Sequence, residues 1–302
     1  MKPRRLSLLL LPALLLTSAD ALAWGLYTHV YFAQLLLWAI PLADPALARL
    51  VRRYPRQVMA GACLPDLALT APGAGAPRME DSHRWASLHA LQQEAKSDLE
   101  HALVLGYASH LMADIIAHNH FVPAHECLWF DAPAEGPVRP LGPEAAIRIR
   151  GWDLITHVVV EWAMDRHVGH QLFATPAQVL AEDRPQVLDL LGRSFAESPD
   201  KLHRALDTLT RAETCLRMAR LPNMLYHLAR RLDRPMERRF NHYLHHTAHR
   251  LGQIGRLLDG ELPRWAAEVE PRSARRRVVQ FPRRLLKARL PLPEDLFHPR
   301  RC

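Results

Sequence analysis

The sequence predicts an all-α, bundle-like single domain of many helices, with additional helices in its C-terminal part. Long apolar runs such as residues 96–118 and 144–168 carry polar residues at helical spacing. Several of the expected helical segments have a proline near their start, and proline is typical of the first turn of a helix. Alternating strand patterns bounded by turns are hard to find. The chain has 302 residues and is 49% hydrophobic, so it can bury a substantial core.

The helices can be placed in order along the chain. They are expected at residues 27–40, 96–118, 144–168, 176–192, 200–231 and 236–258, with a break near Pro222 in the fifth. Proline or glycine follows each of the first three, and a proline near the first turn begins each of the last three. The segment 65–85 is rich in Pro and Gly, so we expect a long irregular loop, and such loops often carry function.

The N-terminal segment has the pattern of a cleavable secretory signal. Residues 1–5 form a basic segment that precedes the mostly apolar residues 6–16. Ala21 and Ala23 supply the small side chains of a cleavage site. The apolar run is too short to span a bilayer. Cleavage would leave Trp24 as the new N-terminus, and we therefore expect a secreted or periplasmic protein.

The net charge of +8 belongs to the end of the chain. Residues 271–302 contain nine arginines and one lysine against two acidic residues, whereas the body, 24–270, is close to neutral. A near-neutral body argues against a broad nucleic-acid groove. The basic Arg/Pro-rich tail could bind an anionic membrane surface.

Four cysteines are too few for a scaffold that depends on disulfides. Export would permit a bridge, and Cys63–Cys127 is a candidate because each lies near a segment with metal-ligand residues. Their spacing in the sequence cannot establish the pairing.

Residues 110–120 contain the strongest chemical signal in the chain. His110, Asp114 and His118 are four residues apart, so in a helix they project from one face. Imidazoles and a carboxylate on an otherwise apolar helix make a poor core and a good metal face. His157 and Glu161 repeat the spacing on a second helix. Two such helices facing each other predict a shared cluster of ions, for which zinc is the best match.

Five motifs with these residues occur in a fixed order. They are Trp24-Gly-Leu-Tyr-Thr-His29, Gly61-Ala-Cys-Leu-Pro-Asp66, Ser82-His83-Arg-Trp85, His110-x3-Asp114 and His157-x3-Glu161. Together they resemble the zinc-dependent phospholipase C / S1–P1 nuclease superfamily, over roughly residues 24–165. The resemblance implies a phospholipase C/P1 nuclease-like all-α fold and a secreted metal-dependent phosphodiesterase.

The resemblance also implies up to three zinc ions. One would be bound by Asp66, His83, His110 and Asp114. A second would use His157, Glu161 and a histidine that follows Asp114. The third would take the α-amino nitrogen and carbonyl oxygen of Trp24 together with His29, and would share Asp114 as a bridge. An α-amine has a pKa of about 8, so zinc can readily displace its proton, and signal cleavage would thus create a ligand.

The histidine that follows Asp114 is either His118 or His120. His118 continues the helix face of Asp114, as in the branch of the family with Asp-x3-His. His120 is six residues after Asp114, as in secreted phospholipase C and S1–P1 nucleases, where a proline bends the helix end. The residues between Asp114 and His120 include no proline. This favours His118 and leaves His120 open.

The implied reaction is phosphodiester hydrolysis by water activated at the zinc cluster, with Asp66 orienting or deprotonating that water. Glu161, rather than Asp, resembles the phospholipases, whereas the five-residue offset of His29 from the new N-terminus resembles the nucleases. The choline-contacting residues of secreted phospholipase C are not matched, since Tyr27 and Leu67 stand where an acid and a tyrosine are expected. A phospholipid is the first expectation for the substrate. A single-strand nuclease, acting on nucleic acid, and a non-catalytic zinc-binding helical protein are the alternatives.

These inferences give a domain organisation. We expect a signal peptide at 1–23, a zinc-dependent phospholipase C-like catalytic region at 24–170, a C-terminal helical region packed on it at 171–270, and the basic tail at 271–302.

Overall fold

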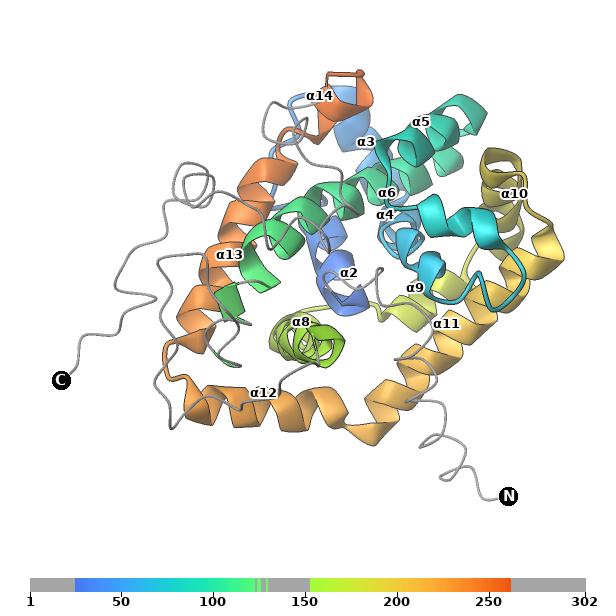
Figure 1. The fold of residues 1–302 in the computed structure, drawn as a ribbon. Coiled ribbons are helices and arrows are strands. Elements are labelled where there is room, and N and C mark those ends of the chain that lie inside the picture. Colours follow the sequence, from blue (N-terminus) through green and yellow to red (C-terminus); the bar gives the residue numbers. More distant parts are fainter. Residues whose placement is uncertain (1–24, 123, 126–128, 130–152, 262–302) are drawn as a thin grey trace.

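The computed structural model describes residues 25–122, 124–125, 129 and 153–261, and in these ranges every regular element is a helix (Figure 1). The α-helices are α2 (Leu26–Leu35), α3 (Pro45–Arg53), α4 (Pro55–Gly61), α5 (Trp85–Glu94), α6 (Asp98–Ile116), α8 (Asp153–Gly169), α9 (Pro176–Ala181), α10 (Arg184–Phe195), α11 (Pro199–Ala219), α12 (Leu221–Leu232), α13 (Met236–Leu251) and α14 (Ile254–Leu258). Two 3-10 helices, η1 (Pro65–Leu69) and η2 (Pro77–Asp81), and a π-helical turn, η3 (Ala117–Phe121), complete the set. The all-α expectation is confirmed.

Helix α6 is the central element of the fold. It begins with a capping box, in which the Ser97 hydroxyl accepts a hydrogen bond from the Glu100 amide and the Glu100 carboxylate accepts one from the Ser97 amide. Nearly all of its residues are buried, as expected for a helix that is apolar on most sides. Helices α2, α4, α5 and α13 pack against it (Figure 1). The polar side chains in its second half, Ser109, His110 and Asp114, therefore lie in the interior.

Two glycines let α4 and α6 cross with their backbones in contact. A Cβ atom at Gly106 would lie 1.9 Å from the carbonyl oxygen of Val58, and one at Gly61 would lie 2.1 Å from that of Leu103. Neither position has room for any side chain. This close approach brings the end of α4, and with it the start of η1, against the middle of α6.

The first predicted helix, 27–40, ends five residues early. The amides of Ala39 and Ile40 both donate to the Leu35 carbonyl, at 2.9 and 3.0 Å, so the chain closes in a turn after α2. Pro41 has no N–H group with which to continue the hydrogen-bond ladder. The segment 65–85, expected to be an irregular loop, contains the short helices η1 and η2.

Two other predicted helices are each divided in two. The segment 176–192 breaks into α9 and α10 at Asp183, which has a left-handed backbone (φ 47°), and Pro185 occupies the first turn of the new helix. The segment 236–258 breaks at Gly252 into α13 and α14. The break expected near Pro222 is confirmed, since α11 ends at Ala219 and α12 follows.

Several expectations fall on residues outside the described ranges. These are the signal peptide, the basic tail and the beginning of the helix expected at 144–168. The domain boundaries stay predictions. Cys63 is buried and free, and its candidate partner Cys127 is not among the described residues. Of the helices described, none combines the length and the apolar character needed to cross a membrane.

We expect Gly106→Ala to destabilise the protein by about 3 kcal/mol or more, because the new methyl group must push α4 away from α6. Gly255→Ala in α14 is the matched control, since its Cβ would lie at an ordinary 3.4 Å from the end of the Leu47 side chain. Equilibrium denaturation of both variants measures the free energy of unfolding. Equal stability of the two variants would contradict the close crossing.

Candidate metal centre

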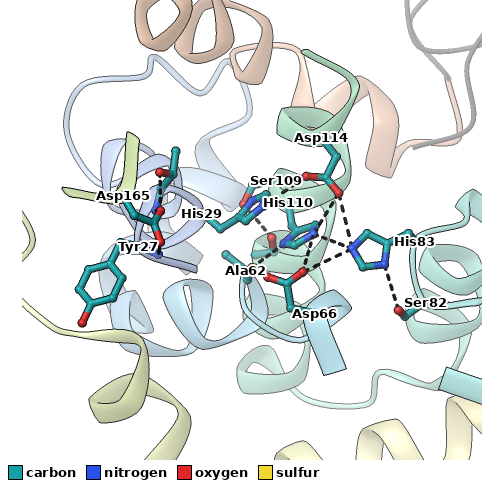
Figure 2. Close-up of polar contacts among 12 residues, drawn as sticks. Tyr27, His29, Ala62, Asp66, Ser82, His83, Ser109, His110, Asp114 and Asp165 are labelled. Carbon is teal, nitrogen blue, oxygen red and sulfur yellow. Dashed lines mark hydrogen bonds and ion pairs between the residues drawn. The ribbon is translucent and has the colours of Figure 1, made fainter. Parts of the chain in front are cut away.

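Five of the residues expected as metal ligands meet inside the protein (Figure 2). They come from separate elements, namely His29 from α2, Asp66 from η1, His83 from the segment before α5, and His110 and Asp114 from α6. Their exposed fractions lie between 0% and 3%. The fold thus concentrates polar groups in a region where isolated ones would be costly.

The carboxylate of Asp114 lies at the centre of this group. Its Oδ1 atom is 3.2 Å from Nε2 of His29. Its Oδ2 atom is 3.1 Å from Nε2 of His110 and 3.5 Å from Nε2 of His83. Each oxygen therefore faces a different side of the cluster, as a carboxylate that bridges two ions must.

Asp66 closes the other side of the group. Its Oδ1 atom is 3.6 Å from Nε2 of His83 and 3.9 Å from Nε2 of His110. The donor atoms form two sets of three, and within each set all three atoms lie within 4.8 Å of one another. The first set comes from His29, Asp66 and His110, and the second from His83, His110 and Asp114. Nitrogen and oxygen donors at this spacing suit zinc.

Contacts at the Nδ1 atoms, which face away from the cluster, orient the rings of His83 and His110. Nδ1 of His110 lies 2.8 Å from the carbonyl oxygen of Ala62, to which it can only donate. The Ser82 hydroxyl donates to the Pro65 carbonyl at 2.7 Å, so it can accept from Nδ1 of His83 at 3.3 Å. Both contacts favour a proton on Nδ1, so that Nε2 faces the cluster and would offer its lone pair to a metal ion on losing its proton, which is the usual arrangement around a metal ligand.

The electrostatics favour a cation at this place. Burial alone would lower the pKa of His110, but the carboxylates of Asp114 and Asp66 outweigh it and raise the pKa to about 9. Burial would raise the pKa of Asp114, and His110 and His29 hold it well below its usual range. The pKa of His29 is lowered by burial and by the adjacent His110, whose ring stacks on it with centroids 3.5 Å apart. The stacked rings oppose a proton on both, while the carboxylates attract positive charge.

Unsatisfied polar atoms provide a direct test of whether the residues fit a metal. Both ring nitrogens of His29 and both carboxylate oxygens of Asp114 are buried without a hydrogen bond of good geometry, although the carboxylate lies 3.1 to 3.5 Å from imidazole nitrogens. Buried polar atoms are nearly always satisfied, so such a group requires an explanation. The chemistry of the donors and their distances fit a divalent cation.

The other predicted ligands are not part of this described group, and metal ligation stays a prediction for all ten residues. Glu161 is completely buried in α8, which packs against α2. His157 belongs to the same helix, but its side chain is not among those described, and Trp24 lies outside the described residues. His118 and His120 are both buried in the π-helical turn η3. The α-helical spacing rule that favours His118 does not hold strictly in a π-turn, so the choice between them stays open.

Asp165 is a site residue that the sequence analysis missed. Its carboxylate accepts hydrogen bonds from the Thr28 amide at 2.9 Å, the Thr28 hydroxyl at 2.7 Å and the Tyr27 amide at 3.4 Å. A Cβ atom at Gly25 would lie 2.0 Å from this carboxylate, so glycine is needed there. Asp165 thus accepts from two amides in the first turn of α2 and fixes the turn that carries His29. Its position four residues after Glu161 was the available signal.

The zinc-dependent phospholipase C family model matches residues 28–212. The chain belongs to this family. The match confirms the resemblance and continues past residue 165, where the recognised motifs end. Comparison with curated proteins and with solved structures finds no match. Family membership and the His/Asp donor groups together support a metal-dependent hydrolase that uses zinc.

We expect Asp114→Asn to reduce the bound zinc by more than one ion per chain, because an amide cannot bridge two cations as a carboxylate does. Elemental analysis of purified protein, with circular dichroism to check the fold, measures this. Asp98→Asn is the control, since Asp98 lies at the exposed start of the same helix. Full zinc content in the Asp114 variant would overturn the bridging role.

Proposed function

We propose that this protein is an exported phospholipase C-like hydrolase that cleaves a phospholipid at a cluster of three zinc ions. The observation that carries the proposal is the buried convergence of His29, Asp66, His83, His110 and Asp114 in a chain of the zinc-dependent phospholipase C family. The basic tail and the predicted signal peptide support an exported enzyme that acts at an anionic membrane.

Bound zinc would neutralise the phosphate oxygens and lower the pKa of an attacking water. The chain's own residues hold and orient the reacting groups. Asp114 is in close contact with three imidazoles, which commits its carboxylate to the centre of the cluster. Asp66 lies farther from its neighbours, at 3.6 and 3.9 Å, and is therefore the carboxylate we propose to orient the water and accept its proton.

The third zinc ion of the proposal depends on the new N-terminus. Gly25 precedes α2 directly and is held against Asp165, and His29 follows one turn later. An N-terminus at Trp24 would adjoin this fixed segment. We propose that its amino group and carbonyl oxygen join His29 as ligands, so that the enzyme matures only when its signal is removed.

The activity is tested with vesicles of mixed phospholipids incubated with the zinc-loaded protein. We expect release of diacylglycerol and phosphorylated headgroups, loss of this activity with a chelator, and recovery with added zinc. Asp66→Asn should lower kcat by about 100-fold or more, as expected for removal of a general base. Asp98→Asn should leave kcat unchanged.

Parallel incubations with denatured DNA distinguish the alternatives. Digestion of the DNA without any lipid product would replace the proposal with a single-strand nuclease. Bound zinc without turnover of either substrate would identify a non-catalytic zinc protein.

We expect a form that retains one extra residue before Trp24 to bind one zinc ion fewer than the form that begins at Trp24. The reason is that the displaced amino group can no longer reach the position beside His29. Elemental analysis of the two forms, prepared in parallel, measures the difference. Equal metal content would refute ligation by the N-terminus.

A further inference from the structure

Helices α11 and α12 meet at an outer corner of the molecule (Figure 1). This corner combines arginines with exposed apolar side chains. We call it the basic corner, and it consists of Arg217, Met218, Arg220, Met224, Leu228 and Arg231. On α12, Met224, Leu228 and Arg231 are spaced by four and three residues, so they lie along one helical face, and Arg220 directly precedes this helix.

The charge of this region has one sign. Residues 214–232 contain four arginines and no acidic residue. Arg217 has a carboxylate neighbour in Glu213, with Nε 3.9 Å from Oε1. Arg220 and Arg231 are exposed and form no ion pair with the described residues. Their guanidinium groups are therefore available to an anionic partner.

The same face exposes apolar surface. The exposed fractions are 66% for Met218, 62% for Met224 and 45% for Leu228, and these are three of the five large hydrophobic residues that are exposed in the described ranges. The opposite face of α12, with Tyr226 and Ala229, is buried against the protein, and α12 packs on α8. The helix is thus already anchored by its inner face, and its outer apolar residues have no packing role.

We propose that the basic corner docks on the surface of a membrane containing anionic phospholipids. Arginine side chains would lie among the lipid phosphates, while the methionine and leucine side chains enter the boundary with the acyl chains. A nucleic acid would use the arginines and leave the apolar side chains in water, so lipid accounts for both features. The inference rests on the proposed function, since it names the surface through which the enzyme reaches its substrate.

The basic corner is also connected to the metal centre. Glu213 of α11 accepts a hydrogen bond from the Tyr27 hydroxyl, two residues before His29. Helix α8, against which α12 packs, carries Asp165, and Asp165 holds the start of α2. A membrane bound at this corner would therefore contact α11 and α12, which in turn contact the elements that position the cluster.

The test measures sedimentation of the full-length, zinc-loaded protein with vesicles of phosphatidylglycerol or of phosphatidylcholine. We expect binding to the anionic vesicles that weakens with salt. Arg220→Gln/Arg231→Gln should lower the partition coefficient by about thirtyfold, since each basic side chain near an anionic surface contributes about 1 kcal/mol. Met224→Ser/Leu228→Ser should weaken binding at high salt as well as at low salt.

Two matched controls separate the basic corner from the rest of the surface. Trp38→Ser/Phe173→Ser removes a different exposed apolar pair, whose rings are 5.7 Å apart, and Arg49→Gln/Arg52→Gln removes exposed charge from α3. Both should bind vesicles as the wild type does. All variants keep the basic tail, so any difference between them reports on the substituted face.

Hydrolysis of a short-chain phospholipid below its micelle concentration is measured in the same variants, and should be unchanged. Vesicle binding that persists in both corner variants, or absent binding by the wild type, would overturn the docking proposal. Binding that is lost in the corner variants, in a protein that hydrolyses no lipid, would support docking while removing the proposed activity. If the corner variants lose binding to DNA, measured in parallel, and keep their binding to vesicles, docking on lipid is overturned.

Discussion

The carboxylate of Asp114 sets the central constraint on this structure. It is completely buried, and removing a charge from water costs several kcal/mol unless partners compensate. Within the described ranges its ion-pair neighbours are the imidazoles of His29, His83 and His110, and none is a lysine or arginine. Imidazoles that stack and crowd one another cannot all be protonated together, so they compensate the charge incompletely. A divalent cation would supply the missing positive charge and would use the same atoms as ligands.

The backbone contact between α4 and α6 makes this arrangement reachable. Because Gly61 and Gly106 have no side chains, the end of α4 comes close enough for the Ala62 carbonyl to accept from His110. The chain then turns into η1 and presents Asp66 to the same histidine. Two adjacent segments thus determine both the orientation of one ligand and the position of another. The tight crossing is a requirement of the site as much as of the core.

The sequence could predict features that depend on local spacing, and it failed where tertiary contacts decide. His110 and Asp114 share a face because a helix repeats every 3.6 residues, and this holds in any fold. Asp66 and His83 carry no local signal and were found only through the family resemblance. The Ala62 carbonyl and the Ser82 hydroxyl could not be found, because any backbone or serine can accept a hydrogen bond.

The sequence also could not predict the π-helical turn η3. This turn ends at Phe121, whose ring packs against those of Phe240 and Tyr243 from α13, and contacts between such distant residues leave no local pattern. Such long-range packing also explains why residues outside the recognised motifs support the site. Asp165 of α8 satisfies the amides at the start of α2, and Glu213 of α11 accepts from the Tyr27 hydroxyl on the same turn. The segment that carries His29 is therefore held by residues more than 130 positions away in the chain. His29 can reach the cluster only if the start of α2 is held in place, and α8 and α11 hold it there.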